Sequence, residues 1–206
     1  MKGYIQVYTG DGKGKTTAAT KEKRGGGREK PPPAIGLAIR SIGAGHRVCI
    51  IQFMKSLAYS EQKILKSLPG ITLITLGKPY FIAKEGMLTE EEIKAWGDKV
   101  TIYPAGNPPA EYRALILKGI DEAVKAVSDG YDLVILDEYN MACWYDLATD
   151  EDTKRILSAR KPNVELVFTG RNVPKLILDS ADLITEMKKI RHYYDKGVIG
   201  REGIED

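Results

Sequence analysis

Residues 9–17 read Thr-Gly-Asp-Gly-Lys-Gly-Lys-Thr-Thr, and they decide which fold this chain can adopt. They follow a short β-prone run, Gly3–Tyr8, and lead into Ala18 and Ala19, which favour helix. A strand, a glycine-rich turn, Gly-Lys-Thr and a helix start together form the context of a phosphate-binding loop. In such a loop, consecutive backbone N–H groups turn inward around an anion, and the helix N-terminus adds partial positive charge.

The residue types in this loop predict individual roles. We expect Lys15 to reach the outer phosphates and the Thr16 hydroxyl to ligate a divalent cation. The predicted phosphate site consists of consecutive residues: Gly10, Asp11, Gly12, Lys13, Gly14, Lys15, Thr16 and Thr17. Thr9 stands where the usual pattern has its first glycine, so this loop is one residue shorter. A plain Gly/Lys-rich turn before a helix is the alternative, and the strand–helix context disfavours it.

Length and composition limit the possible classes of protein. With 206 residues, 43% of them hydrophobic, the chain suits one domain with a sizeable core. Its 31 basic and 28 acidic residues leave a net charge of +3, too small an excess to indicate a nucleic-acid partner. Cys49 and Cys143 are isolated in the sequence, so we interpret them as small buried hydrophobic side chains of a protein that resides in a reducing compartment. Without a signal peptide or an apolar run of membrane length, we expect a cytoplasmic protein with no membrane partner.

Residues 20–34 interrupt the first predicted helix. They hold three glycines and three prolines among charged residues, so we predict a flexible insertion that cannot continue a helix. Helical spacing of apolar residues resumes over Ile35–Gly43, and skipping the insertion joins residues 16–19 to it in one amphipathic helix. A basic arm for phosphate or nucleic acid is the alternative, and a solvated loop is favoured.

Strand and helix patterns alternate along the rest of the chain. The predicted strands are nearly continuous apolar runs, at residues 46–52, 71–76, 132–136, 165–168 and 183–185. The predicted helices have helical apolar spacing or a start signal, at residues 59–68, from 89, 111–128, 150–159 and 174–179. This alternation predicts an α/β fold whose mostly parallel sheet has helices on both faces. The polar segment 188–206 is expected to lie across the surface or over the site.

Two of the predicted strands end in residues suited to a phosphate site. Asp137 and Glu138 follow the strand at 132–136, and ligands in open α/β sheets bind beyond the carboxyl ends of strands. We therefore expect these carboxylates opposite the loop, where they can ligate Mg²⁺; the sequence does not rank them securely. Arg171 follows the strand at 165–168 and can pair with phosphate oxygens, although a surface arginine is the default on spacing alone.

The sequence shows no Ser/His/Asp or Cys/His catalytic pattern. His46 and His192 lie far apart, and each alone is more often structural. Chemistry that runs on positioning and electrostatics, such as phosphoryl or nucleotidyl transfer, fits this absence.

Beyond the loop, many stretches of the chain resemble the P-loop class of ATP:corrinoid adenosyltransferases. The similar stretches are Gly10–Ala19, Ile35–Arg40, Gln52–Lys55, Leu136–Asn140, Thr169–Arg171, Ala181–Met187, His192, Asp195–Val198 and Gly203–Glu205. The likeness runs from residue 3 to 206 except for residues 20–34, and the C-terminal stretches are its most specific part. It implies a three-layer P-loop NTPase-like fold with about six central strands, formed by a single domain of residues 1–206.

The resemblance implies transfer of the 5′-deoxyadenosyl group of ATP to the cobalt of a reduced corrinoid. Co(I) attacks the ribose C5′ and the whole triphosphate leaves, in adenosylcobalamin biosynthesis or salvage. A Co(I) nucleophile needs no protein base, whereas the leaving charge must be held by loop amides, Lys15 and a Mg²⁺ or Mn²⁺ ion. The resemblance further implies that ATP binds in the opposite orientation from that in most P-loop enzymes, which would explain the shortened loop. The resemblance also implies a homodimer and a flavoprotein electron donor.

The resemblance assigns roles by position. Gly10–Thr16 would hold the triphosphate together with Thr17 and Arg171. Thr16 and Glu138 would bind the metal, with Asp137 as a further candidate. Lys15, Thr16 and Glu138 form the predicted catalytic set.

Tyr80 and Phe81 are candidate corrinoid contacts. The family places a Phe and a Trp after its third strand, where they cap the corrinoid. Here Tyr80 stands at the Phe position and Ile82 at the Trp position. Core packing is an equally good interpretation of these side chains.

Two other functions remain open from the sequence. An ordinary P-loop ATPase or small-molecule kinase would release ADP rather than triphosphate. A non-catalytic nucleotide or corrinoid binder, impaired by the insertion at residues 20–34, would bind ATP without turnover.

Overall fold

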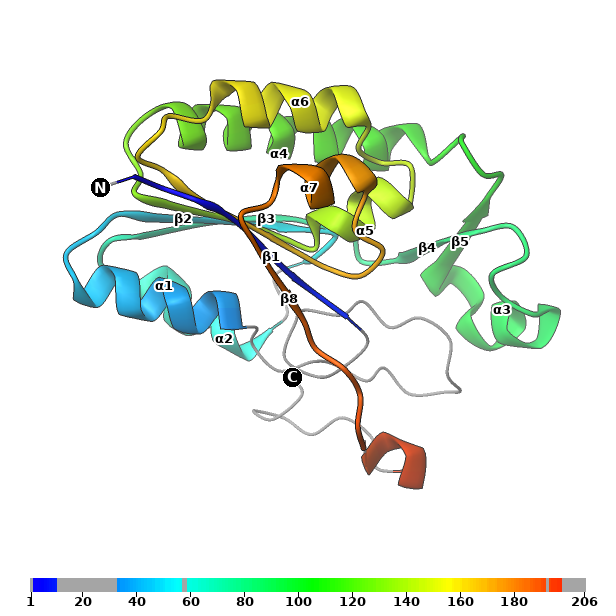
Figure 1. Cartoon of the computed structure of the whole chain (residues 1–206). Helices are drawn as coiled ribbons and strands as arrows, with labels where there is room; N and C mark the ends of the chain where they lie inside the picture. Colours follow the sequence, from blue (N-terminus) through cyan, green and yellow to red (C-terminus); the bar gives the residue numbers. More distant parts are fainter. Residues whose placement is uncertain (1, 11–32, 57–58, 192, 198–206) are drawn as a thin grey trace.

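A parallel sheet of six strands forms the centre of the protein (Figure 1). The computed structural model describes residues 2–10, 33–56, 59–191 and 193–197. The strands lie in the order β3-β2-β6-β7-β1-β8, and every neighbouring pair is parallel. Their bounds are β1 Ile5–Thr9, β2 Val48–Phe53, β3 Ile71–Leu76, β6 Leu133–Asp137, β7 Glu165–Thr169 and β8 Leu183–Glu186. The predicted parallel sheet of about six strands is confirmed.

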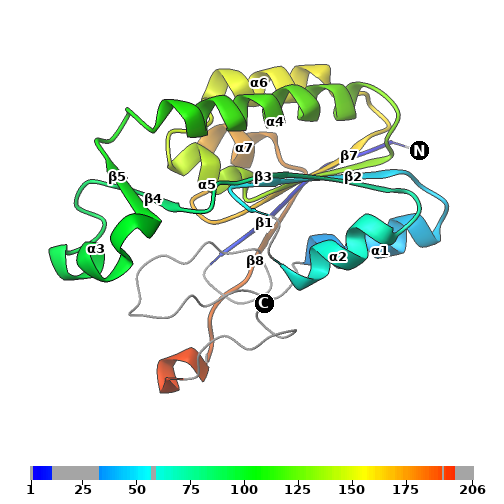
Figure 2. The same cartoon turned by 180° about the vertical axis from the view of Figure 1, so that it is seen from behind.

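Helices cover both faces of this sheet, so the predicted three-layer α/β architecture is confirmed. One face carries α1 (Pro33–Gly43) and α2 (Ser60–Ser67). Figure 2 shows the opposite layer as well, and its helices are α4 Ala110–Ser128, α5 Tyr139–Trp144, α6 Asp150–Ala159 and α7 Lys175–Ser180. A 3₁₀ turn at Tyr193–Lys196 follows the last strand. Within the described residues, no helix combines the length and apolar character needed to cross a membrane.

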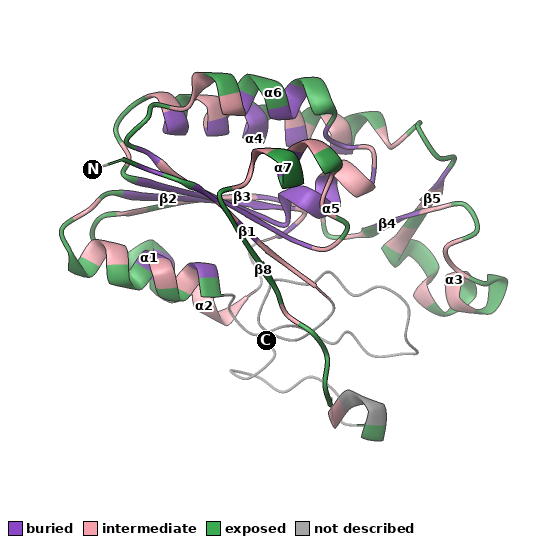
Figure 3. Ribbon diagram, viewed as in Figure 1, coloured by how far each residue is buried: buried purple, intermediate pink, exposed green. Residues whose placement is uncertain are grey.

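The core is divided by the sheet into two apolar layers. In β2, Cys49, Ile51 and Phe53 belong to the layer under α4, whereas Val48 and Ile50 belong to the layer under α1. This alternation is the two-residue period of a strand that is buried on both faces. Figure 3 shows the buried residues concentrated in the central strands, while the edge strand β8 is exposed along its length. Cys49 is buried as predicted, and Cys143 is only partly buried.

A small arm extends from the carboxyl end of β3, beyond the edge of the central sheet (Figures 1 and 2). It consists of β4 (Phe81–Lys84) and β5 (Val100–Tyr103), which pair in parallel, joined by α3 (Glu90–Trp96) and a 3₁₀ turn. The helix start predicted at residue 89 is confirmed, because Thr89 and Glu92 form a reciprocal capping box. The Tyr103 hydroxyl donates a hydrogen bond to the backbone oxygen of Tyr145 at 2.6 Å. This bond ties the arm to the residue that ends α5.

The predicted boundary of the insertion at residues 20–34 is wrong at its end. Pro33 and Ala34 are the first two residues of α1, and Ala34 is fully buried under the sheet. Proline suits the first position of a helix, since its φ is already helical and that N–H has no intrahelical partner. Pro33, the last proline of the run, therefore marks a helix start. Residues 20–32, and the predicted continuity of the helix with residues 16–19, lie outside the described residues.

Candidate active site

The carboxyl ends of the parallel strands meet at one edge of the sheet, and strained backbone gathers there. Four strands continue into a residue with positive φ: Gly10 after β1 (111°), Met54 after β2 (59°), Glu138 after β6 (60°) and Gly170 after β7 (119°). Three of these residues stand immediately beside, or within, the predicted ligand set. Such conformations persist where the surrounding structure fixes them, and they cluster at functional sites.

The chain turns at Gly10 beside the end of β8. A Cβ atom added to Gly10 would lie well inside van der Waals contact with the backbone of Met187. The turn at the end of β1 therefore requires glycine, both for its positive φ and for this close approach. Gly10 is the first residue of the predicted phosphate loop and lies at the predicted edge. The other loop residues, Asp11, Gly12, Lys13, Gly14, Lys15, Thr16 and Thr17, lie outside the described residues.

A cleft of about 620 Å³ opens beside Gly10. Residues from the ends of β1, β7 and β8 line it, and these are Thr9, Gly10, Arg171, Asn172, Glu186, Lys188, Lys189 and Ile190. The described residues that line the cleft include three cationic side chains and one carboxylate, and Glu186 lies 3.4 Å from Lys188 in an ion pair. This excess of positive charge suits a polyanion. Sequence reasoning identified Arg171 but missed Lys188 and Lys189, for which the basic run after the last strand was the available signal.

Glu138 is a buried carboxylate at the start of α5. Its backbone N–H donates to the Thr169 hydroxyl at 3.0 Å. Its Oε2 atom would lie 3.3 Å from a Cβ added to Gly170, so the side chain extends along the end of β7, next to Arg171. The structure thus places the Glu138 side chain beside the turn that follows β7.

The same turn is closed by Asn140. Its side-chain amide donates to the backbone oxygen of Gly170 at 3.0 Å, and the residue is fully buried. Its Oδ1 atom has no hydrogen-bond partner in the described part of the chain. Sequence reasoning did not single out this residue, because a lone Asn after a strand carries no signal of its partner.

Asp137 is engaged by protein groups on both carboxylate oxygens. Thr169 donates to Oδ1 at 2.8 Å, and Gln52 donates to Oδ2 at 3.2 Å. The Lys55 ammonium lies 3.1 Å from Oδ2 in a buried ion pair. Burial alone would lower the pKa of Lys55, but the charges of Asp137 and Glu138 outweigh it, so the pKa lies above its ordinary value. Lys55 therefore stays protonated and balances one of the two adjacent carboxylates.

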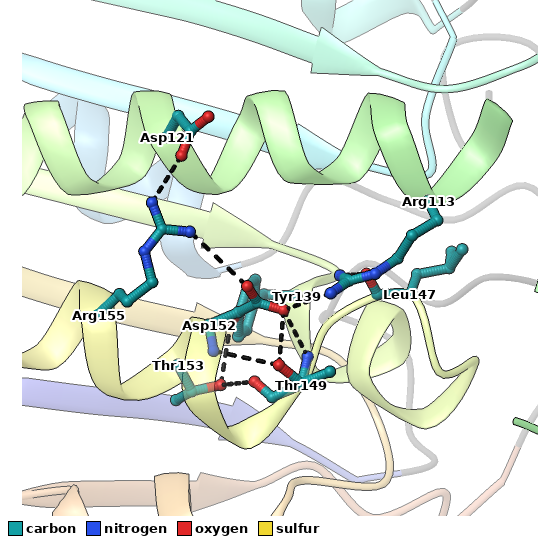
Figure 4. A network of polar contacts seen from close by, with 8 residues as sticks. All are labelled: Arg113, Asp121, Tyr139, Leu147, Thr149, Asp152, Thr153 and Arg155. Atoms are coloured by element: carbon teal, nitrogen blue, oxygen red, sulfur yellow. Dashed lines mark hydrogen bonds and ion pairs between the residues drawn. The ribbon is translucent and has the colours of Figure 1, made fainter. Parts of the chain in front are cut away.

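A polar network joins α4, α5 and α6, beginning at the residue that follows Glu138 in the chain (Figure 4). Tyr139, the next residue, places its hydroxyl 3.0 Å from the Thr153 hydroxyl of α6. Asp152 in the same helix accepts a hydrogen bond from Arg113 of α4 at 2.8 Å. Burial alone would raise the pKa of Asp152, but the hydrogen bonds that it accepts outweigh this and lower the pKa. These contacts join α4, α5 and α6 into one support behind the site.

Of the candidate corrinoid residues, Phe81 is the exposed one. Its ring is 45% exposed and packs edge-on against Trp96 at a centroid distance of 4.8 Å. Tyr80 packs against Tyr112, and its hydroxyl donates to the Glu111 carboxylate. Burial, followed by this hydrogen bond, raises the pKa of Tyr80 to about 12. Ile82 is buried in the core, which fits the packing interpretation of that position.

The donor set at this edge can be compared with the requirements of a hard divalent cation. Glu138 offers a buried carboxylate next to the expected phosphate position, and the structure groups no three His, Cys, Asp or Glu side chains as a metal site among the described residues. One or two protein oxygens, completed by phosphates and water, are the usual environment of Mg²⁺. Glu138 therefore fits a nucleotide-bound cation better than a dedicated protein cage.

Comparison with known proteins agrees with this geometry. A family model described as ATP:corrinoid adenosyltransferase BtuR/CobO/CobP matches residues 23–205. A corrinoid adenosyltransferase of Sinorhizobium sp is 29% identical over 209 residues, covering 99% of this chain and 80% of that protein. The corrinoid adenosyltransferase CobA of Salmonella typhimurium is 28% identical over 204 residues, covering 99% of this chain and 86% of that protein. The corrinoid adenosyltransferase of Escherichia coli K12 is 27% identical over 205 residues, with the same coverages of 99% and 86%.

The resemblance seen in the sequence is thereby confirmed. The family model extends over most of the chain, from before α1 to beyond the last described residue. The chain therefore belongs to the ATP:corrinoid adenosyltransferase family.

Proposed function

We infer that this protein is an ATP:corrinoid adenosyltransferase of cobalamin metabolism. It transfers the 5′-deoxyadenosyl group of ATP to the Co(I) centre of a reduced corrinoid and releases triphosphate. The observation that carries this conclusion is the match of the family model to residues 23–205. The cationic cleft at Gly10, with Glu138 at the same sheet edge, supports it as a place for a triphosphate.

The proposed division of labour follows from the charge that develops in the reaction. Co(I), as part of the substrate, attacks the ribose C5′ and needs no protein base. Negative charge then accumulates on the leaving triphosphate, and the loop amides of residues 10–17 with Lys15 are proposed to hold it. Arg171 lies in the cleft and adds a bidentate donor for phosphate oxygens. The protein's further task is to align cobalt, C5′ and the leaving oxygen.

Thr16 and Glu138 are the proposed ligands of a Mg²⁺ or Mn²⁺ ion. Such an ion supplies positive charge to the phosphate oxygens as the triphosphate departs. The partners of Asp137 support Glu138 as the principal carboxylate ligand, because Thr169, Gln52 and Lys55 already engage both oxygens of Asp137. Lys15, Thr16 and Glu138 remain the proposed catalytic set.

Further parts of the proposal concern the partners. Phe81, the exposed aromatic side chain of the arm, is proposed to contact the corrinoid, with Tyr80 beside it. A homodimer, a flavoprotein electron donor and a cytoplasmic location are proposed from the family resemblance.

The decisive experiment identifies the phosphate product. The protein is incubated anaerobically with ATP, Mg²⁺ and chemically reduced cobalamin. We expect a light-sensitive adenosylated corrinoid and one equivalent of triphosphate; ADP and phosphate without that corrinoid would instead indicate an ATPase or kinase. ATP binding without either product would indicate a non-catalytic binder.

Three variants sharpen this test. Lys15→Ala should weaken ATP binding severely, and Glu138→Gln should reduce turnover and the response to Mg²⁺. Lys154→Ala is the matched control, because this lysine is exposed on α6 and forms an ion pair there with Glu151. Unchanged ATP affinity in Lys15→Ala would contradict the assignment of the phosphate loop.

A further inference from the structure

The backbone of Glu138 has a conformation that needs outside support. Its φ and ψ are 60° and 19°, in the left-handed region that side-chain-bearing residues seldom occupy. Holding a non-glycine residue in this conformation costs free energy that neighbouring contacts must offset. The proposed metal-binding carboxylate therefore keeps its place only if neighbouring groups over-determine it.

The Thr169 hydroxyl contacts the backbone N–H of Glu138. It accepts the Glu138 N–H at 3.0 Å and donates its own proton to Asp137 Oδ1 at 2.8 Å. A hydroxyl has a single proton, so donation to Asp137 fixes its orientation and directs a lone pair at the Glu138 N–H. Thr169 is fully buried, so water cannot easily replace either bond.

Asp137 is fixed in turn from the opposite side. Its Oδ2 atom receives Gln52 Nε2 at 3.2 Å and lies 3.1 Å from the Lys55 ammonium. Gln52 accepts a hydrogen bond from Gln62 of α2 at 2.8 Å, and Gln62 also donates to the backbone oxygen of Ser56 at 3.0 Å. The chain of bonds thus runs from α2 through β2 and β6 to β7.

Charge and burial suit this arrangement to a positioning role. Gln52 and Gln62 are both almost fully buried, and buried amides that are satisfied by each other give a rigid connection. Lys55 neutralises Asp137, so the cluster retains the single negative charge of Glu138. Removal of any inner link would leave a buried polar group without its partner, which costs more than the bond itself contributes.

We propose that Gln62, Gln52, Lys55, Asp137 and Thr169 form a polar brace that positions Glu138, with the Thr169 hydroxyl as the link that touches it. The inference rests on the proposed function, since it assigns Glu138 to the metal. In this brace Asp137 and Thr169 are positioning residues, and they act on the reaction through Glu138.

The test compares Thr169→Val, which keeps the shape of the side chain, with Thr169→Ser, which keeps the hydroxyl. Loss of a partner that orients a metal ligand typically costs about 10–100-fold in metal affinity or activity. We expect Thr169→Val to weaken Mn²⁺ binding to the protein–ATP complex by about that factor, measured by electron paramagnetic resonance, and to lower kcat with little change in the KM for corrinoid. Thr169→Ser should restore both quantities.

Thr72→Val is the matched control, because it removes a threonine hydroxyl of an exposed β3 residue that accepts a hydrogen bond from Tyr131. Gln62→Met tests the outer end of the brace and should shift Mn²⁺ affinity in the same direction by a smaller factor. Gln62→Met also serves if Thr169→Val fails to fold, which thermal unfolding would reveal.

Glu138→Gln separates this inference from the proposed function. If Glu138→Gln leaves Mn²⁺ affinity and turnover unchanged, the assignment of Glu138 to the metal is wrong. If Glu138→Gln is impaired while Thr169→Val and Gln62→Met behave as wild type, the metal assignment stands and the brace is overturned. Equal impairment of Thr169→Val and Thr169→Ser would also overturn it, because the hydroxyl would then not be the link.

Discussion

The ion pair between Lys55 and Asp137 can be tested by removing each charge separately and then both. The two groups are 3.1 Å apart and almost fully buried. With an effective dielectric constant of about 20, their attraction is about 5 kcal/mol. Asp137→Asn leaves the Lys55 ammonium buried beside a neutral amide, and breaking a buried pair in this way costs about 3–5 kcal/mol of unfolding free energy. Lys55→Met should cost a similar amount, because Asp137 then loses the positive charge that lies 3.1 Å from its Oδ2 atom.

The double variant should be more stable than the two single effects predict. Asp137→Asn with Lys55→Met removes both charges of the pair together, so neither partner keeps a charge that has lost its counterion. We expect a coupling free energy of at least about 2 kcal/mol from urea unfolding of the nucleotide-free protein. The single variants should melt about 6–20 °C below wild type for a domain of this size.

Additive effects in this cycle would refute the structural role given to the pair. An Asp137→Asn variant with unchanged stability would have the same meaning, because it would indicate that the carboxylate is not held by Lys55. The exposed pair of Lys154 and Glu151 provides the comparison cycle, for which a coupling of at most about 0.5 kcal/mol is expected.

Three further perturbations address the arm, the polar network of α4, α5 and α6, and the proposed corrinoid contact. Tyr103→Phe removes the buried bond to the backbone of Tyr145 and should cost about 0.5–1.5 kcal/mol in urea unfolding, with an unchanged KM for ATP. The pKa of Asp152 is lower in the folded than in the unfolded protein, so its contribution to stability is complete above about pH 3.9 and is lost as the pH falls through the folded-state pKa. Asp152→Asn should therefore make the free energy of unfolding less dependent on pH in this acidic range. Phe81→Ala loses the edge contact with Trp96, so we expect a stability loss of about 0.5–1.5 kcal/mol and a raised KM for corrinoid with unchanged ATP affinity. An unchanged corrinoid KM would indicate that this ring only packs against the arm.

Much of the architecture could be predicted because its signals are local. The spacing of apolar residues marks α4 over its whole length, and acidic first turns after a capping threonine mark α3 and α6. The parallel order of strands was predictable as a class, and this alone brings Gly10, Glu138 and Arg171 to one edge. The strand order itself has no signal in a single sequence.

The missed elements are short or depend on distant partners. Strands β4 and β5 have four residues each, too few for an alternating pattern to emerge. Helix α5 begins after a residue with positive φ and has six residues, so neither a capping side chain nor a helical spacing of apolar residues predicts it. Gln52 lies in an otherwise apolar strand, and its partners Asp137 and Gln62 are identified only when the chain is folded. Buried polar contacts of this kind are long-range, and composition or spacing does not reveal them.

The position of β1 in the sheet has a consequence for the growing polypeptide. This strand, which leads into the proposed phosphate loop, lies between β7 and β8, so Ile5 pairs with Leu166 and Gln6 with Leu183. A nascent chain that has emerged only as far as α6 contains the whole loop but neither neighbour of its strand. The proposed nucleotide site therefore takes shape only after β7 and β8 have also left the ribosome.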